Sequence, residues 1–314
     1  MDEDMAALQA HELEAVHGYA FVDGRYMPLA EATIPLVERG FLRSDVTYDA
    51  IHVWKGRFFR LQDHLARFRA SIAGLKMSLP YSDTEISDIL RECVRHTGLS
   101  DAFLILICTR GMPSPATRDP RQSRNRFYAY AQPFARIANE EQQERGMRMI
   151  LSRVQRIPSA SLDQRIKNFH WLDLTMSQFE AYERDAEITV LPSADGTITE
   201  GPGFNVFIVR DGALATPDHG MFEGITRRTV TEIATDLQLR CEVRSVRAIE
   251  MLDADEIFIS STAGGIAPVT SFEGKPVGDG RPGVLTRRIT EIYWQRHEDP
   301  ALTTPVDQEA VPAE

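Results

Sequence analysis

The grouping of strand and helix patterns constrains the fold of this chain more than any other feature of its sequence. Two hairpins are expected first, around Asp23-Gly24 and Lys55-Gly56. Apolar residues at helical spacing then predict helices from Leu61 to Met77 and from Asp83 to Thr97. Two strands follow, at 102–109 and 126–132. Because the strands are grouped and do not alternate regularly with helices, they predict an α/β fold with mixed α+β sheets and not a doubly wound parallel sheet.

The second half of the chain continues this mixture. Strands are expected near 147–154, 187–192, 204–209, 241 and 256–260, and helices over 170–184, 226–238 and 284–297. A third hairpin is expected at Asp211-Gly212. The length of 314 residues is typical of two domains.

A polar segment marks the predicted boundary between these domains. We expect a smaller N-terminal α/β domain over 18–135, a linker over 136–146 and a larger C-terminal α/β domain over 147–298. The segments 1–17 and 299–314 are expected to be loose ends.

Charge and cysteine content exclude several classes of function. Lysine and arginine number 35 against 46 aspartates and glutamates, which gives a net charge of −11 and argues against a nucleic-acid surface. No apolar run is long enough to span a membrane, and the acidic start lacks the basic residues of a signal peptide. The three cysteines are widely spaced in apolar surroundings, so reduced thiols and a cytoplasmic location are expected.

Lys167 is the lysine whose surroundings suggest chemistry. It lies in Gln-Arg-Ile-Lys167-Asn-Phe-His-Trp171. Most lysines are solvated surface charges, and Lys167 could be one of them. Its apolar flanks Ile166, Phe169 and Trp171 also allow burial, which lowers the pKa of a lysine amine and makes it a nucleophile that can form a Schiff base. The sequence leaves both interpretations open.

Glu200 lies in a glycine-rich corner, Thr199-Glu200-Gly-Pro-Gly203-Phe-Asn205. It could be an ordinary turn residue. The glycines would also let a planar ligand approach the backbone, and a buried carboxylate needs a cationic partner such as a protonated pyridine nitrogen. A strand is expected after these glycines, so the segment is not a dinucleotide-binding fingerprint.

Two further segments are candidates for binding a phosphate. Gly224-Ile-Thr226-Arg opens an expected helix whose free N–H groups favour an anion, and Ser261-Thr262-Ala-Gly264-Gly265 is a small-residue turn after an expected strand. Each could be an ordinary cap or turn. His64 and Arg67 lie three residues apart and share one helix face. Metal, serine-hydrolase and nucleotide-triphosphatase motifs are absent from the sequence, so no metal site is expected.

Six motifs follow one another along the chain: Gly40-Phe-Leu-Arg-Ser-Asp45-x-x-Tyr48-Asp, His64-x-x-Arg67, Lys167-Asn-Phe-x-Trp171, Thr199-Glu200-Gly-x-Gly-Phe-Asn205, Gly224-Ile-Thr226-Arg and Ser261-Thr262-Ala-Gly-Gly. In this order they resemble the fold-type IV pyridoxal-phosphate aminotransferases, and the similarity extends from about residue 18 to 297. Within that class, the segments Arg-Ser-Asp-Val-Thr-Tyr, Phe-Phe-Arg-Leu-x-Asp-His and Lys-Asn-Phe-x-Trp-x-Asp-Leu resemble the (R)-selective amine transaminases most. Branched-chain and D-amino-acid aminotransferases are more distant relatives.

The resemblance implies roles for these residues. Lys167 would hold pyridoxal 5′-phosphate as an internal aldimine and then act as the general base, and Glu200 would pair with the pyridine nitrogen. The phosphate would be bound by Arg67, the N–H groups of Ile225 and Thr226, and the hydroxyls of Thr226 and Thr262. Tyr48, Phe103 and Trp171 would line the substrate pocket.

The same resemblance implies two domains with the cofactor between them, a homodimer that completes each site, and transfer of an amino group from an (R)-amine or D-amino acid to a 2-keto acid such as pyruvate. The transfer would proceed in two half-reactions through pyridoxamine phosphate. Two alternatives on this fold are a branched-chain L-amino-acid aminotransferase and a lyase resembling aminodeoxychorismate lyase. A non-catalytic binding protein is a third alternative.

The sequence departs from the amine transaminases at the substrate side. Those enzymes usually carry His where this chain has Arg43, and Gln where it has His170. They often offer a mobile arginine in a covering loop, but the corresponding position here is Ala116, with Arg118 two residues later. We therefore expect either Arg43 or Arg118 to bind a substrate carboxylate; Arg43 could equally point into solvent.

Overall fold

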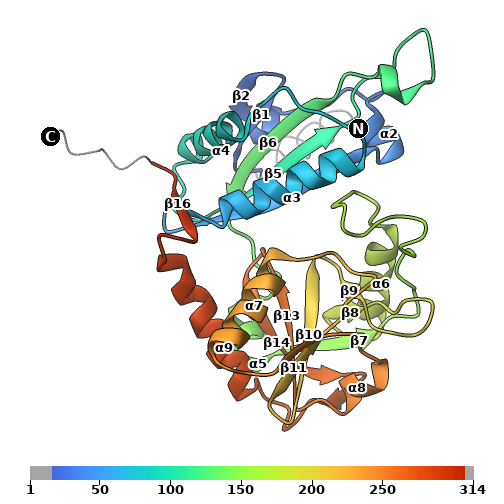
Figure 1. Cartoon of the computed structure of the whole chain (residues 1–314), viewed down its shortest axis with the longest axis vertical. Helices are drawn as coiled ribbons and strands as arrows, with labels where there is room; N and C mark the ends of the chain where they lie inside the picture. The colour runs from blue at the N-terminus through green and yellow to red at the C-terminus, as the bar shows by residue number, and fades with distance from the viewer. Residues whose placement is uncertain (1–15, 308–314) are drawn as a thin grey trace, which may run out of the picture. The chain divides into compact units, whose positions relative to one another are not determined.

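The computed structural model describes residues 16–307 of the chain (Figure 1). The chain divides into two compact units. The first unit runs to Ala135 and also contains Lys167–Phe169 and the chain from Pro300 onward. The second contains Arg136–Ile166 and His170–Asp299. Three residues from the middle of the sequence, including Lys167, therefore belong to the first unit. Of the predicted loose N-terminal segment, residues 1–15 lie outside the described residues.

The first unit is built on a seven-stranded sheet with the order β16-β4-β3-β5-β6-β1-β2. Its strands are β1 (Tyr19–Val22), β2 (Arg25–Pro28), β3 (Val46–Trp54), β4 (Arg57–Phe59), β5 (Ala102–Thr109), β6 (Arg126–Pro133) and β16 (Thr303–Pro305), and every neighbouring pair is antiparallel. Its helical segments are η1 (Leu29–Glu31), α2 (Arg39–Arg43), α3 (Leu61–Gly74), α4 (Asp83–Thr97) and η2 (Pro120–Gln122).

The two predicted hairpins of this unit are confirmed. Asp23 and Gly24 join β1 to β2, and both have positive φ angles, 51° and 80°. Lys55 and Gly56 join β3 to β4 with φ angles of 50° and 72°. A two-residue turn with positive φ at both positions matches the twist of the flanking strands, which explains why these pairs fix the hairpins.

Helices α3 and α4 cover one face of the sheet (Figure 1). Side chains alternate along β3, so Ile51 and Val53 join the core beneath the helices, and Tyr48 lies on the opposite face. Helix α4 begins and ends where the sequence predicts. Ser82 and Glu85 form a capping box at its start, and Gly98 ends it with a φ of 68°.

The second unit is built on a nine-stranded mixed sheet. The main order is β12-β11-β10-β13-β14-β7-β8, with β9 beside β10 and β15 beside β14. Its strands are β7 (Met147–Leu151), β8 (Ile188–Val190), β9 (Glu200–Gly201), β10 (Phe204–Arg210), β11 (Ala213–Thr216), β12 (Cys241–Val243), β13 (Glu256–Ser261), β14 (Gly265–Phe272) and β15 (Lys275–Pro276). Its helices are α5 (Glu140–Arg145), α6 (Leu172–Glu183), α7 (Ile225–Asp236), α8 (Ala248–Leu252), α9 (Val284–Gln295) and the short η3 (Arg296–Glu298).

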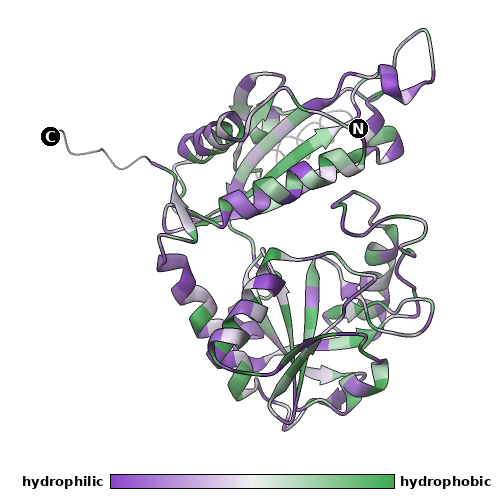
Figure 2. Ribbon diagram, in the orientation of Figure 1, coloured by the Kyte–Doolittle hydropathy of each residue, from purple (hydrophilic) through white to green (hydrophobic). Residues whose placement is uncertain are grey.

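Helices α7 and α9 pack against the central strands β13 and β14 (Figure 1). Within the sheet, Phe207 of β10 stacks on Phe258 of β13, with 4.9 Å between ring centroids. Figure 2 shows hydrophobic stretches in these central strands, interrupted by polar positions. An antiparallel sheet in the first unit and a mixed sheet in the second, each with helices, confirm the predicted α/β fold class with α+β sheets.

Three segments differ from the prediction. The segment 136–146, for which a linker is predicted, contains α5, which Asn139 and Gln142 start with a capping box. The tail predicted as loose contains β16, which pairs with β4. Strand β14 is not predicted at all, because its start at Gly264 and Gly265 and its internal Pro268 are typical of a turn.

The three cysteines agree with the prediction of reduced thiols. Cys93, Cys108 and Cys241 are free thiols. Burial raises the pKa of Cys93 and of Cys108 to about 12, so both stay protonated and unreactive.

Within residues 16–307, no helix is both long enough and apolar enough to cross a membrane.

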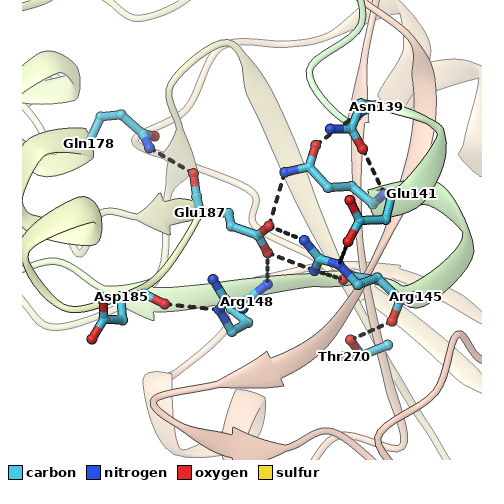
Figure 3. A network of polar contacts seen from close by, with 10 residues as sticks. Asn139, Glu141, Arg145, Arg148, Gln178, Asp185, Glu187 and Thr270 are labelled. Atoms are coloured by element: carbon cyan, nitrogen blue, oxygen red, sulfur yellow. Dashed lines mark hydrogen bonds and ion pairs between the residues drawn. The ribbon is translucent and has the colours of Figure 1, made fainter.

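An ion-pair network joins α5 to the edge of the second sheet (Figure 3). The Glu187 carboxylate accepts hydrogen bonds from the Arg145 guanidinium, from Gln142 Nε2 at 3.0 Å and from the Arg148 amide at 2.9 Å. The hydrogen bond from Arg145, together with those from Arg148 and Gln142, lowers the pKa of Glu187 to about 2 against the opposing effect of burial. The network therefore stabilises the fold only where Glu187 is ionised.

We expect Glu187→Gln to lower the unfolding free energy by about 1 to 3 kcal/mol at pH 7, because it removes charged hydrogen bonds. The folded pKa is depressed, so this contribution is complete above the unfolded pKa of about 4.3 and is lost as the pH falls toward 2. Thermal unfolding of both proteins from pH 7 to pH 2 measures it. Midpoints that differ by the same amount at pH 2 and pH 7 would contradict this prediction.

Candidate active site

Lys167 is held at the edge of β3 in the first unit. The backbone carbonyl of Lys167 accepts hydrogen bonds from the Tyr48 amide at 3.2 Å and from the Thr47 hydroxyl at 2.6 Å. The Lys167 amide donates to Ser71 Oγ on α3 at 3.3 Å. Strand β4 pairs only with the far end of β3, so the near end is open to this segment. Backbone contacts therefore position the segment that carries Lys167.

The amine of Lys167 lies over an aromatic ring. Its Nζ is 4.5 Å from the centroid of the buried Tyr48 ring. Phe169 packs against the same ring, with 4.9 Å between centroids. Lys167 itself is half-buried. Partial burial therefore distinguishes Lys167 from a fully solvated surface lysine, and the Tyr48 ring attracts its ammonium form.

Arg67 is fixed on α3 by a carboxylate that the sequence analysis leaves without a role. Asp49 is fully buried on β3, and it binds Arg67 through two hydrogen bonds of 2.8 Å. His64 Nδ1 lies 2.8 Å from the same carboxylate. The sequence prediction that His64 and Arg67 share a helix face is confirmed. In the sequence, the signal for the role of Asp49 is a carboxylate inside a predicted strand of mostly apolar residues.

The electrostatics of this group are those of a permanent ion pair. Burial opposes ionisation of Asp49, but the charge of Arg67 and the hydrogen bonds from both partners hold the pKa of Asp49 well below its usual value. Burial keeps the pKa of His64 below its usual value, although Asp49 acts in the opposite direction. His64 is therefore neutral and donates its Nδ1 proton to Asp49. Arg67 remains 14% exposed, so part of its guanidinium is accessible to an anion.

Glu200 belongs to a buried trio of charges in the second unit. Arg156 donates from Nε to Glu200 at 2.9 Å and from Nη1 to Asp173 at 2.6 Å. The second oxygen of Glu200 accepts the Phe222 amide at 2.8 Å. Burial works against the charge of Arg156, but the two carboxylates outweigh it and raise the pKa of Arg156. Negative charges outnumber positive charges by one within this trio.

Sequence analysis missed Arg156 and Asp173 as members of this site. Arg156 lies in an irregular segment without a periodic pattern, and it is 44 residues from Glu200 in the sequence. Asp173 lies two residues after Trp171, in the first turn of α6. In the sequence, the position of Asp173 close to the lysine motif is the only signal for Asp173 or for Arg156.

Helix α7 begins beside this trio. Asn205 Nδ2 donates to the Phe222 carbonyl at 2.7 Å, which fixes the loop that leads into the helix. Gly224 starts α7, and a Cβ atom there would lie 2.2 Å from Asn205 Oδ1, so glycine is required. Ile225 and Thr226 are buried in the first turn, where backbone N–H groups have no partner within the helix. This start of α7 can bind an anion.

Thr262 lies in a turn at the end of β13. Ser261 Oγ donates to the Gly203 carbonyl at 2.8 Å, so the turn is tied to the glycine corner after Glu200. Gly203 has a φ of 83°, and a Cβ atom there would lie 3.6 Å from the Trp171 ring. Within the second unit, the turn that contains Thr262 and Trp171 at the start of α6 therefore both adjoin the glycine corner after Glu200.

The residues of the first unit that are predicted to contact the substrate lie in two separate places. Phe103 pairs with His52, and Tyr48 pairs with Ile107, so Phe103 and Tyr48 share one face of the sheet about 13 Å apart along β5. Arg43 and Arg118 line a separate cavity of about 580 Å³, together with Arg39 and the loop from Pro113. Arg43 and Arg118 are exposed. The residues that line this cavity do not include Tyr48 or Lys167.

These groups suit a planar, phosphorylated cofactor with a basic ring nitrogen. The half-buried amine of Lys167 can bind a carbonyl carbon, and the anionic trio around Glu200 can stabilise a cationic ring nitrogen. Arg67 and the start of α7 each favour a phosphate. The donor set of each unit therefore fits pyridoxal 5′-phosphate.

Comparisons with known proteins agree with this chemistry. The family model of amino-transferase class IV matches residues 47–272. The chain is 30% identical to the D-alanine aminotransferase of Bacillus licheniformis, over 85% of this chain and 93% of that protein. It is 27% identical to a putative branched-chain-amino-acid aminotransferase of Methanocaldococcus jannaschii, over 87% and 94%.

Solved structures that are similar to this chain are also aminotransferases. The branched-chain amino acid aminotransferase of Thermobaculum terrenum, in its pyridoxal-phosphate form, is similar with a TM-score of 0.83 and 26% identity, over 93% of this chain and 99% of that one. A branched-chain aminotransferase of Thermoproteus uzoniensis with norvaline gives a TM-score of 0.84 and 28% identity, over 92% and 99%. The chain therefore belongs to the class IV aminotransferases, the pyridoxal-phosphate-dependent aminotransferases of fold type IV.

Proposed function

We propose that this aminotransferase moves an amino group from an (R)-amine or a D-amino acid to a 2-keto acid such as pyruvate, in two half-reactions. The observation that carries the proposal is the 30% identity to a D-alanine aminotransferase over most of both chains. Removal of the amino group from D-alanine yields pyruvate, so the proposed acceptor is the keto acid of that donor. The amine-transaminase motifs around Arg43 and Lys167 extend the donor class to simple amines.

Pyridoxal phosphate, when bound, carries the amino group between donor and acceptor and withdraws electrons from the reacting carbon. Lys167 would bind the cofactor and then hold and move the proton at the donor carbon. Glu200 would keep the ring nitrogen protonated, and Arg156 and Asp173 would fix its carboxylate. Arg67, the amides of Ile225 and Thr226, and the hydroxyls of Thr226 and Thr262 would bind the phosphate.

Three aromatic residues would line the substrate pocket. Tyr48 lies under the Lys167 amine, Phe103 shares its face of the sheet, and Trp171 adjoins the glycine corner of the second unit. Aromatic walls suit donors with apolar side chains. These positions support a preference for hydrophobic amines and amino acids.

A branched-chain L-amino-acid aminotransferase is the second candidate. The observation that favours it is the likeness to the enzymes of Thermobaculum terrenum and Thermoproteus uzoniensis, which covers 92% or more of this chain. Both candidates share the proposed roles of Lys167, Glu200 and Arg67. They differ in which face of the donor carbon is presented to the Lys167 amine.

A donor panel separates these candidates. We expect (R)-1-phenylethylamine and D-alanine to transfer their amino groups to a common keto acid faster than L-leucine does, measured as product formation by chromatography. A clear preference for L-leucine would overturn the proposal in favour of the second candidate. Pyruvate release from an aminodeoxychorismate-type substrate, without any acceptor, would instead indicate a lyase.

Arg43 and Arg118 are proposed to bind the substrate carboxylate, and they share one cavity. If Arg43 binds it, Arg43→Ala should raise the KM for D-alanine and pyruvate about tenfold or more and leave the KM for (R)-1-phenylethylamine unchanged, because only the former carry carboxylates. Arg118→Ala, assayed with the same three substrates, shows which arginine acts. Equal losses for amines and amino acids in both variants would exclude a carboxylate-binding role.

We propose a homodimer as the working form. The described part of α6 carries an exposed apolar stripe of Leu172, Met176 and Phe179 at helical spacing. Exposed apolar stripes of this kind are typical of protein interfaces. A second copy of this chain is the partner that the resemblance to the family suggests.

A further inference from the structure

The first unit contains an apolar cavity that none of the proposed catalytic roles uses. Its volume is about 410 Å³, which is typical of cavities that hold small molecules. It is bounded by the segment from Leu29 to Val46, by the ends of β1, β5 and β6, and by Phe169. Glu38 is the only charged residue on this wall among residues 16–307, and it is 0% exposed. The wall therefore offers a mostly apolar surface without an accessible charge.

The cavity lies on the face of the sheet that also carries Tyr48. Tyr48 of β3 is directly opposite Ile107 of β5. In the same row, Ile107 is opposite Tyr128 of β6, and Tyr128 is opposite Val22 of β1. Side chains that pair in this way share one face, and the last three of them line the cavity. Because neighbouring strands are about 4.8 Å apart, the cavity begins one strand away from the Tyr48 ring that lies under the Lys167 amine.

Phe169 contacts both the cavity and the surroundings of the amine. Its ring lines the cavity, and its centroid is 4.9 Å from the centroid of the Tyr48 ring. Lys167 Nζ lies 4.5 Å from the same Tyr48 centroid, so the amine and the Phe169 ring lie against one aromatic side chain. Phe169 is 41% exposed, so close packing does not enclose its ring and the side chain can change rotamer.

We propose that this cavity receives the apolar side chain of large amino donors, and that Phe169 moves aside to admit it. The inference rests on the proposed transamination and adds a donor class to it, namely amines and amino acids with a long, uncharged, apolar side chain. The methyl group of D-alanine is too short to extend past Phe169. The cavity would therefore distinguish donors by the length of the side chain and not by configuration.

The first test compares two donors with a common keto acid. (R)-Butan-2-amine and (R)-4-phenylbutan-2-amine have the same configuration at the reacting carbon, and only the second carries a terminal phenyl ring. We expect kcat/KM to be about tenfold or more higher for the phenyl donor, because its ring is buried against an apolar wall. Equal values for the two donors in the wild-type enzyme would contradict the inference.

Variants locate the phenyl ring. Val22→Phe fills the end of the cavity that is farther from Tyr48, so it should remove most of the advantage of the phenyl donor and leave (R)-butan-2-amine unchanged. Val243→Phe, at an exposed position of β12, is the matched control and should change neither donor. Phe169→Ala opens the path to the cavity and should raise the ratio of the two kcat/KM values further. An unchanged ratio in Phe169→Ala would exclude Phe169 as the barrier.

Calorimetry separates the cavity from the reaction. The probe is 4-phenylbutan-2-ol, which has the apolar body of the larger donor but no amino group, so it binds the holoenzyme without reacting. Val22→Phe should weaken its binding about tenfold, and Val243→Phe should not. If neither amine served as a donor, the proposed function would fail, and the alcohol would still test the cavity. Equal alcohol affinity and an equal donor ratio in Val22→Phe and wild type, with both proteins folded, would overturn the inference.

Discussion

Replacing Lys167 by alanine should lower the transamination rate by about 10²- to 10⁴-fold or more, because the chain would lose the group that is proposed to bind the cofactor and to move the proton at the donor carbon. The fold should persist. The hydrogen bonds that hold this segment use the backbone of Lys167, with Thr47, Tyr48 and Ser71 as partners, so the alanine variant keeps all of them. Loss of activity would then report chemistry and not unfolding.

Two measurements separate these roles. Borohydride reduction of the holoenzyme should attach the cofactor irreversibly to the chain, and mass spectrometry should place it on Lys167 and not on Lys55, Lys76 or Lys275, the other lysines. Added methylamine should restore part of the proton transfer in Lys167→Ala. Lys275→Ala, at an exposed strand position, is the matched control and should keep wild-type activity. Full activity in Lys167→Ala would disprove the assignment.

The sequence predicted those elements whose conformation is determined by interactions between neighbouring residues. Hairpins at Asp23-Gly24 and Lys55-Gly56 need positive φ angles at both turn residues, and such turns are short-range features. Helix α4 carries its own start and stop signals in Ser82, Glu85 and Gly98. These elements could be read from the sequence because neighbouring residues alone fix them.

Elements that depend on distant partners were missed or misread. Strand β14 contains Pro268 and begins at Gly265, directly after Gly264, yet it pairs with β13 and β7 in the middle of the second sheet. Strand β16 contains only three residues, and its pairing with β4 joins segments that are more than 240 residues apart. No local pattern records such a contact, so a terminal strand of this length resembles a loose tail.

The candidate site shows the same division. Lys167, Glu200 and Arg67 stand in motifs whose composition suggested chemistry. Their partners Asp49 and Arg156 did not, because an isolated charge in a strand or a loop becomes meaningful only when folding places it beside another charge.

The second large effect is expected at Glu200. Glu200→Gln should lower kcat by about 10²- to 10³-fold, because a neutral amide cannot stabilise a cationic ring nitrogen where charge develops during the reaction. The amide has nearly the shape of the carboxylate, but its single oxygen can accept from Arg156 or from the Phe222 amide and not from both, because these donors bind different oxygens of Glu200. Arg156 would also keep its bond to Asp173, so the buried guanidinium would retain one anion and the fold should remain intact.

Asp173→Asn is the matched control for this substitution. It removes one negative charge from the same trio, but the Asp173 carboxylate contacts Arg156 and the Ile157 amide and does not carry the role proposed for Glu200. Rates of the two half-reactions, normalised to bound cofactor, should therefore fall far more in Glu200→Gln than in Asp173→Asn. If both variants lost kcat equally, the net charge of the trio would matter and not the position of Glu200. A wild-type kcat in Glu200→Gln would remove Glu200 from the mechanism, and Lys167 would then need another group to stabilise charge on the ring.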